Sequence, residues 1–205
     1  MRGVVIGLTG QTGAGKSTVA GIITKLYPDT VVIDADKVSR EIMCDGGECI
    51  EELKKRFGSD ITDSTGHLIR PLLAQRAFCS RENTELLNSI VHPLIIARSG
   101  EYIDAARNKH GLIIFDAPQL FESGGDRLCD ITLSVTAPVD IRLKRIMKRD
   151  SLTESAALLR INAQHDEAYY KSRSDHLLDG SLPLWQVQEQ AAELLNKIKG
   201  TEVLS

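Results

Sequence analysis

Residues 10–17 read Gly-Gln-Thr-Gly-Ala-Gly-Lys-Ser and follow the short apolar run Val4–Leu8, which predicts a buried strand. The spacing of the glycines, the lysine and the serine is that of a phosphate-binding loop between a strand and a helix. Glycines let the backbone turn sharply and direct N–H groups at phosphate oxygens, and a helix that begins at Lys16 adds its positive end. Lys16 can then reach the β- and γ-phosphates, and Ser17 can ligate Mg²⁺. The stretch therefore predicts a nucleoside triphosphate site, with a plain glycine turn as the alternative.

Length, charge and cysteine content set the class of protein. A chain of 205 residues is long enough for one domain with its own core. The net charge is −3 and charges of both signs are mixed along the chain, which argues against a nucleic-acid or membrane-surface partner. No apolar run approaches the ~18 residues of a spanning helix, so we expect a cytoplasmic protein. The four cysteines show neither a CxxC pair nor zinc-finger spacing, so they are expected to be reduced thiols.

Short β-branched runs alternate with helical stretches, a pattern typical of a parallel sheet. The expected strands are 4–8, 31–33, 112–115, 131–135 and 176–178. The expected helices outside the long connection between the second and third strands are 16–26, 139–149, 153–165 and 183–199. That connection is far longer than a crossover needs, and it indicates several helices over 47–57, 70–78, 84–90 and from Pro93 onward. An insertion of this kind usually holds a substrate.

Two carboxylates, Asp34 and Asp36, follow the second expected strand. Open α/β sheets bind their ligands at this edge. An enzyme that phosphorylates a hydroxyl group benefits from a carboxylate that orients the acceptor and takes its proton, and we assign that role to Asp36. Asp36 can equally serve as the N-cap of a helix over 37–43, and the two roles are compatible.

The third expected strand ends in Asp116, the position of a Walker-B aspartate that holds Mg²⁺ directly or through water. Turn chemistry at Asp116-Ala117-Pro118 explains the residue equally well. In the loop that follows, Phe121 and Glu122 can border an acceptor pocket, although Phe121 can also lie in the core.

A dense basic stretch follows the fourth expected strand, on a helix that we interpret as part of a lid. Arg145 and Arg149 lie one turn apart, so they can share a face and neutralise phosphate charge during phosphoryl transfer. Arg160 and Gln164 repeat this spacing on the next helix, as in a returning arm of the same lid. The alternative is a solvated basic helix face.

Taken together, these motifs resemble the dephospho-CoA kinase family, within the P-loop nucleoside and nucleotide kinase-like group. The matching runs cover most of the chain: 7–10, 15–20, 33–36 with Arg40, 63–70, 92–95, 118–122, and Arg145 with Arg149-Asp150. The resemblance implies a three-layer α/β P-loop fold with a parallel five-stranded sheet of order 2-3-1-4-5. It implies a single domain over 1–205, in which 44–110 is a helical coenzyme-binding insertion and 140–170 a lid. The implied reaction transfers the γ-phosphoryl of ATP to the ribose 3'-hydroxyl of dephospho-CoA.

The resemblance also implies roles for individual residues. The implied ATP ligands are Gly13, Ala14, Gly15, Lys16, Ser17, Thr18, Arg145 and Arg149, of which Lys16 and Arg145 act with the base Asp36 in catalysis. The implied acceptor-binding residues are Asp36, Arg70, His92, Leu120 and Glu122, although a lone histidine such as His92 is more often a structural hydrogen-bonder. The expected Mg²⁺ ligands are Ser17 and Asp116.

The chain departs from the family pattern at three places. Gln11-Thr12 stands where the family usually has Gly-Ile, and Gln119 where it usually has leucine. Asp179 precedes Gly180 where the family tends to have an asparagine before a glycine, on the side where adenine would bind. None of these changes removes an implied phosphate ligand or the base.

Other functions remain open from the sequence. The nearest is another small-molecule kinase of the same group, acting on a nucleoside, a nucleotide or shikimate, because fold and loop are shared. A GTPase would need an NKxD motif, and the sequence Asn196-Lys197 continues as Ile198-Lys199. A non-catalytic ATP-binding module would need Lys16 and be indifferent to loss of Asp36. The oligomeric state is not indicated.

Overall fold

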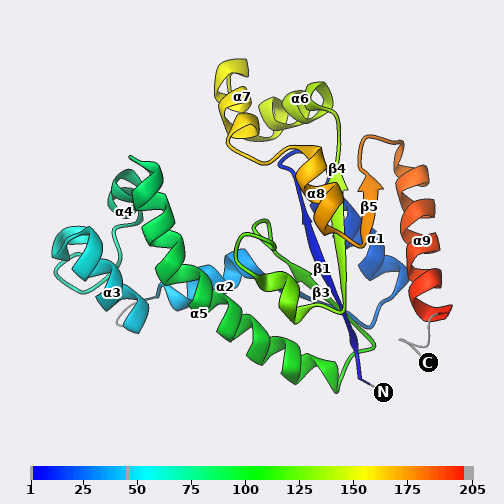
Figure 1. Ribbon diagram of the computed structural model, residues 1–205, viewed down its shortest axis with the longest axis horizontal. Helices are drawn as coiled ribbons and strands as arrows, with labels where there is room; N and C mark the ends of the chain where they lie inside the picture. The colour runs from blue at the N-terminus through cyan, green and yellow to red at the C-terminus, as the bar shows by residue number, and fades with distance from the viewer. Residues whose placement is uncertain (1, 45–46, 201–205) are drawn as a thin grey trace. The chain divides into compact units, whose positions relative to one another are not determined.

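The computed structural model describes residues 2–44 and 47–200. In this part of the chain five strands form one sheet of order β2-β3-β1-β4-β5 (Figure 1). The strands are β1 (Val4–Gly10), β2 (Thr30–Asp34), β3 (Leu112–Asp116), β4 (Ile131–Thr136) and β5 (His176–Asp179). β1 pairs in parallel with β3 and β4, and β4 with β5. The predicted fold class and strand order are confirmed.

The helices follow the predicted pattern with two exceptions. They are α1 (Lys16–Leu26), α2 (Ala35–Ile42), α3 (Glu48–Phe57), α4 (Arg70–Ala77), α5 (Arg81–Arg107), α6 (Val139–Asp150), α7 (Glu154–Asn162), α8 (Glu167–Arg173) and α9 (Leu184–Gly200), with 3-10 turns η1 (Ser59–Ile61) and η2 (Gly125–Leu128). The prediction of separate helices over 84–90 and from Pro93 was wrong, because α5 runs through the proline. The short helix α8 was not predicted; the helix expected to reach His165 ends at Asn162, and α8 starts after its cap Asp166.

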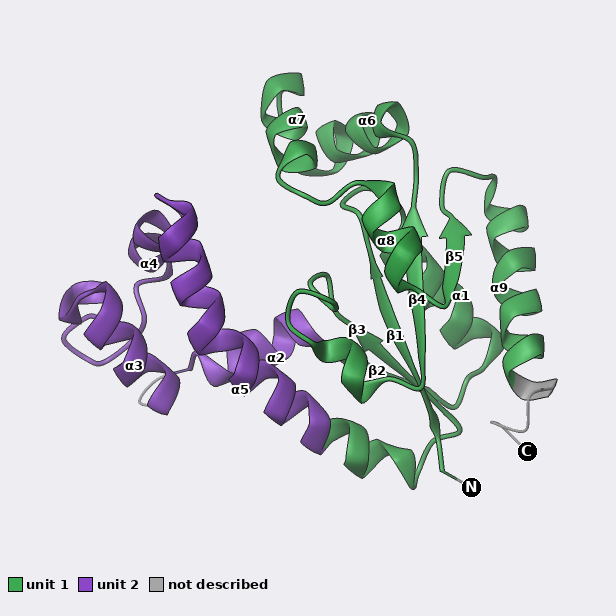
Figure 2. Cartoon of the chain, viewed as in Figure 1, with its two compact units in different colours: residues 1–33, 102–205 green, residues 34–101 purple. Residues whose placement is uncertain are grey.

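The chain divides into two compact units (Figure 2). The first contains residues 1–33 and 102–205, and the second contains residues 34–101. The expected insertion started at residue 44 and ended at residue 110, and it includes residues 45–46, which lie outside the described part. The second unit has an apolar core of its own, made by Cys49, Leu53, Phe57, Ile61, Leu73, Ala77 and Val91.

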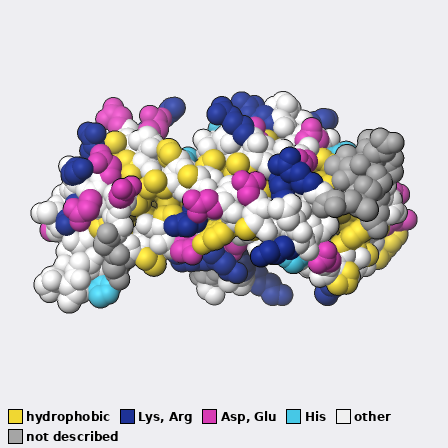
Figure 3. All heavy atoms as spheres, turned by 90° about the horizontal axis from the view of Figure 1, so that it is seen from below, with side chains coloured by type: hydrophobic (Ala, Val, Ile, Leu, Met, Phe, Trp, Pro, Cys, Tyr) yellow, Lys and Arg dark blue, Asp and Glu magenta, His cyan; other side chains and the backbone are white. Residues whose placement is uncertain are grey.

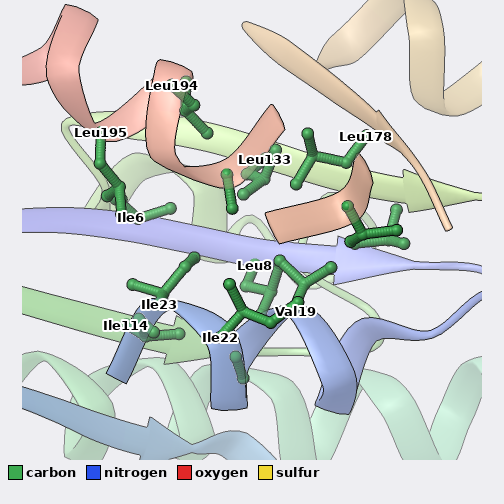
Figure 4. Packing of buried hydrophobic residues seen from close by; sticks show 14 of the residues in the cluster. Ile6, Leu8, Val19, Ile22, Ile23, Ile114, Leu133, Leu178, Leu194 and Leu195 are labelled. Atoms are coloured by element: carbon green, nitrogen blue, oxygen red, sulfur yellow. The ribbon is translucent and has the colours of Figure 1, made fainter. Parts of the chain in front are cut away.

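In the first unit, the core lies where α1 and α9 pack on the sheet (Figure 4). Every residue of β1 is buried, which is typical of a central strand of a parallel sheet covered on both faces. Ile22 and Ile23 of α1 and Leu194 of α9 contribute to this core, and α8 lies in front of the strands with α1 behind them in Figure 1. Because β1, β3 and β4 are parallel, their carboxyl ends meet at one edge, which is where the glycine-rich loop begins.

Two surface properties bear on the class of protein. On the face shown in Figure 3, lysines and arginines are interspersed with aspartates and glutamates. Among the described helices, none combines the length and the apolar character needed to cross a membrane. The cytoplasmic location stays a prediction.

Candidate functional site: a phosphate-binding loop and its surroundings

The glycine-rich loop joins β1 to α1 and leaves the N-terminus of α1 uncapped. α1 begins at Lys16 after Gly15, and no described side chain caps the helix. Gly13 has a left-handed backbone with φ of 78°, and a Cβ at this position would lie 2.9 Å from the carbonyl oxygen of Arg142. Glycine is therefore needed at Gly13 for both conformation and space. The first N–H groups of α1 and its positive end are suited to an anion.

Lys16 forms an ion pair with Asp116, the last residue of β3. The two side chains are largely buried, with 17% and 16% of their surface exposed. Asp116 pairs in register with Leu8 of β1, so the parallel pairing of the two strands brings it to the edge where α1 begins. The two groups that the sequence assigned to phosphate and to metal thus lie together.

Ser17 and Asp116 are chemically suited to Mg²⁺. Ser17 is exposed in the first turn of α1. Hydroxyl and carboxylate oxygens are the donors that Mg²⁺ prefers, and in nucleotide sites it takes one or two carboxylates together with phosphate oxygens and water. In the described ranges no group of three or more His, Cys, Asp or Glu side chains is arranged to hold a metal ion. The residues present therefore fit a metal held jointly with a nucleotide.

The two arginines of α6 that the sequence assigned to the phosphates have different partners in the structure. The Arg145 guanidinium donates to the carbonyl oxygens of Gly13 and Ala14 at 3.2 and 3.1 Å, so it lies against the glycine-rich loop. Arg149 instead makes two bonds of 2.7 and 2.8 Å to the carboxylate of Asp150, which Arg160 also contacts at 2.6 Å. These bonds hold the pKa of Asp150 below its usual value. In this structure the neighbouring carboxylate engages Arg149, so only Arg145 lies against the loop, and the role of Arg149 toward the phosphates stays a prediction.

Two further residues contact the loop and were not predicted as site residues. Arg142 donates from Nε to the carbonyl oxygen of Thr12 at 2.9 Å and from Nη2 to Oε1 of Gln164 at 3.2 Å. The same Oε1 accepts from the N–H of Thr12 at 2.7 Å. Arg142 is only 2% exposed, and burial lowers the pKa of its guanidinium. The available signal was the position of Arg142, one helical turn before Arg145.

A pocket of about 240 Å³ opens beside the loop within the first unit. Its lining residues are Gly15, Thr18, Arg145, Gly180, Leu182, Leu184 and Val187. Gly180 packs so closely on the carbonyl oxygen of Ala14 that a Cβ there would clash with it. Asp179 accepts from the backbone N–H and hydroxyl of Ser181 at 2.8 and 2.5 Å, so its side chain shapes the loop after β5. Mostly apolar walls next to a phosphate loop suit the base and ribose of a nucleotide.

The segment after β3 places its residues in different surroundings. Leu120 is fully buried and lies close to Gly7 of β1, so its side chain is a packing residue, and the assignment to the acceptor site is wrong for this structure. Phe121 is half-buried with its ring edge-on to Tyr169 at 6.2 Å. The Glu122 side chain is 26% exposed, with its carboxylate 3.6 Å from Nε2 of His165. Glu122 is therefore partly accessible to a ligand.

Within the second unit, Asp34 and Asp36 have separate roles. Asp34 is the N-cap of α2, and its carboxylate accepts from the N–H groups of Asp36 and Lys37 at 2.9 and 3.1 Å. The alternative in which Asp36 caps this helix is therefore wrong. Asp36 is exposed in the first turn of α2.

Arg70 and His92 also belong to the second unit. Arg70 is the first residue of α4 and is exposed, and its Nη2 lies 3.4 Å from the carbonyl oxygens of Arg40 and Met43. His92 is half-buried on α5, directly before Pro93. The positive charge of Arg70 is paired with no carboxylate of the described residues.

Most of the chain is similar to proteins of one known family. Residues 4–184 match the model of the family described as Dephospho-CoA kinase. A protein of that name from Corynebacterium diphtheriae is 40% identical over 178 residues, which is 86% of this chain and 88% of the relative. Another from Moorella thermoacetica is 38% identical over 176 residues, covering 85% of this chain and 82% of the relative.

Solved structures show the same fold. The crystal structure of TT1252 from Thermus thermophilus is 29% identical, with a TM-score of 0.78 over 96% of this chain and 98% of the other. A dephospho-CoA kinase from Campylobacter jejuni is 22% identical with a TM-score of 0.60, covering 95% and 96% of the two chains. A shikimate kinase from Bacteroides thetaiotaomicron shares the fold at 14% identity, with a TM-score of 0.54 over 96% and 98% of the two chains. On the match of its sequence over residues 4–184 and on its relatives, the chain belongs to the dephospho-CoA kinase family.

Proposed function

We propose that this chain is an ATP-dependent kinase that phosphorylates the ribose 3'-hydroxyl of dephospho-CoA to give coenzyme A. In this transfer a bond forms between the 3'-oxygen and the γ-phosphorus, and the bond from that phosphorus to the β–γ bridging oxygen breaks. ADP leaves with the bonding electrons, and the hydroxyl proton passes to a carboxylate. The observation that carries the proposal is the uncapped helix end behind the glycine-rich loop, with Lys16 and Arg145 beside it, in a chain of this family.

ATP is the co-substrate in this proposal. Its phosphates bind the N–H groups of residues 13–18, and its base and ribose occupy the pocket between Gly180 and Leu184. When the triphosphate binds, Lys16 turns to the β- and γ-phosphates, and its ion pair with Asp116 is weakened. Arg145 already lies against the loop carbonyls and needs only a side-chain movement to reach the phosphates. Arg149 would have to release Asp150 to do the same.

Mg²⁺ would be held by the hydroxyl of Ser17 and by Asp116, directly or through water. When bound, the ion neutralises charge on the phosphate oxygens as the transfer proceeds. Before the nucleotide binds, the ion pair with Lys16 orients the carboxylate of Asp116 at this edge of the sheet. The protein's own contribution is thus to fix the donors before the nucleotide arrives.

Asp36 is the proposed base toward the 3'-hydroxyl. Its exposed carboxylate stands in the first turn of α2, whose N-terminus Asp34 already satisfies, so Asp36 is not needed as a cap. Arg70, whose bonds to carbonyl oxygens are long, is suited to an anionic group of the acceptor. His92 and Glu122 are proposed as further acceptor contacts, and Leu120 is left out because it is buried.

The test is an ADP-release assay with Mg-ATP and a panel of acceptors: dephospho-CoA, nucleoside monophosphates, uridine and shikimate. The proposal expects ADP release only with dephospho-CoA, and a product heavier by one phosphoryl group on the 3'-oxygen. Release with shikimate or a nucleotide instead would assign the chain to another activity of the same fold. Slow release without any phosphorylated acceptor would identify an ATP-binding module.

A further inference from the structure

The phosphate-binding loop is held from outside by the side chains of two residues far along the chain. Gln164 lies in the connection 163–166 between α7 and α8, and Arg142 lies in the first turn of α6. Between them they engage both backbone groups of Thr12: the N–H donates to Gln164 at 2.7 Å, and the carbonyl oxygen accepts from Arg142 at 2.9 Å. A 3.2 Å bond from Arg142 to Gln164 links the two. Thr12 therefore has neither of its main-chain groups left for solvent.

Adjacent contacts extend this arrangement by one residue on each side. Gln11 is buried, and its Nε2 donates to the carbonyl oxygen of His165 at 3.2 Å. Gly13 lies so close to the Arg142 backbone that it has no room for a side chain. The connection 163–166 and the start of α6 thus fix residues 11, 12 and 13 together, at the start of the stretch 13–18 that is proposed to bind the phosphates.

The burial of Arg142 makes its hydrogen bonds costly to lose. Arg142 is 2% exposed, and no carboxylate in the described part of the chain pairs with it, so its charge is compensated only by neutral oxygens. Gln164 uses one oxygen for both bonds, so an apolar side chain in its place would leave the N–H of Thr12 and Nη2 of Arg142 without this acceptor. A glycine-rich loop is costly to order, and a loop ordered before binding retains more of its interaction energy as affinity.

From this geometry we propose that Gln164 and Arg142 are positioning residues for the nucleotide: they pre-order the phosphate-binding loop and thereby set its affinity for the triphosphate. They touch the loop backbone at Thr12, which precedes the residues proposed to contact phosphate. A purely structural role in packing α6 and α8 would lower thermal stability and leave nucleotide affinity unchanged. The two roles are therefore separable. The inference rests on the proposed use of ATP.

The test measures binding of Mg²⁺ with a non-hydrolysable ATP analogue by calorimetry, and KM for ATP and for dephospho-CoA, on the full chain. Gln164→Leu is expected to weaken nucleotide binding about tenfold, or about 1.4 kcal/mol, with KM for dephospho-CoA within about twofold. Gln164→Glu keeps an oxygen in place and is expected to bind the nucleotide within about threefold of the native protein. Gln188→Leu, at an exposed position on α9, is the matched control and should match the native protein.

Several results would overturn the proposal: nucleotide affinity of Gln164→Leu within about twofold of native, equal weakening in the leucine and glutamate variants, or equal weakening in the control. If the leucine variant does not fold, Gln164→Asn, whose amide is one methylene short of Thr12, takes its place under the same limits. A native protein that binds no Mg-nucleotide would contradict the proposed function itself. Native binding with unaffected variants would overturn only the positioning role.

Discussion

The junctions from β1 to α1 and from β2 to α2 are both turns from a strand of the same sheet into a helix, but they satisfy the helix N-terminus in opposite ways. α1 follows a glycine, has no acidic residue in its first turn and receives no cap from a described side chain. α2 is capped by Asp34 and carries Asp36 in its first turn. Because a helix N-terminus attracts negative charge, the first junction is left for an external anion, whereas the second brings its own. In the proposed function, the first junction binds phosphate and the second offers a carboxylate to the acceptor.

Lys16→Ala tests the first junction and should have the largest effect. The variant loses a cation at the proposed phosphate site and leaves Asp116 without its ion-pair partner. We expect kcat/KM for ATP to fall by about a thousandfold or more, measured by ADP release with dephospho-CoA as acceptor. Lys25→Ala, an exposed position in the last turn of α1, is the control. Retention of a tenth of native activity in Lys16→Ala would remove this lysine from the mechanism.

Asp36→Asn tests the second junction. The amide keeps the size of the side chain but cannot accept the hydroxyl proton, so kcat should fall by about a hundredfold or more. The capping bonds of α2 come from Asp34, so the helix should remain intact by circular dichroism. Unchanged turnover in this variant would show that another group takes the proton.

The loop at the first junction could be predicted from the sequence because it depends on residues close together in the chain. The glycine spacing and the strand before it predicted the loop, and helix α1 has the predicted bounds of Lys16–Leu26. At the second junction the sequence offered Asp36 as the possible cap of a helix over 37–43, and this was wrong: α2 begins at Ala35 and is capped by Asp34, the last residue of β2. Periodicity alone does not decide such a shift.

Features that depend on distant residues were not predicted. The contacts of Thr12 with Arg142 and Gln164 join positions 130 and 152 residues apart, so no local pattern indicates them. The burial of Leu120, which follows β3, depends on its packing over Gly7 of β1. Pro93 was interpreted as a helix start, yet a proline within a long helix removes one hydrogen bond and can be tolerated when the rest of the helix packs well.

Arg145 and Arg149 of α6 test which cations act with the first junction in binding ATP. Arg145→Gln should raise KM for ATP by about tenfold to fiftyfold, because this guanidinium lies against the loop and lines the pocket. Arg149→Gln should change it by no more than about threefold, because Asp150 already engages Arg149. Initial rates at varied ATP decide between them. Equal losses would mean that Arg149 leaves Asp150 when the nucleotide binds.

Asp34→Ala should have the smallest effect, and it acts on stability. Removing an N-cap side chain costs about 1 kcal/mol in the free energy of unfolding, whereas Asp34→Asn should lose less, because asparagine caps equally well. Urea unfolding followed by circular dichroism measures both. An alanine variant as stable as the native protein would contradict the assignment of Asp34 as the cap.

The division between the two junctions is tested most directly by the dissociation constant of Mg²⁺ with a non-hydrolysable ATP analogue, measured by calorimetry for the native protein, Lys16→Ala and Asp36→Asn. We expect binding at least about tenfold weaker in the lysine variant and within about twofold of native in the aspartate variant. An aspartate variant that loses nucleotide affinity as strongly as the lysine variant would contradict this division, because the carboxylate of α2 would then belong to the nucleotide site.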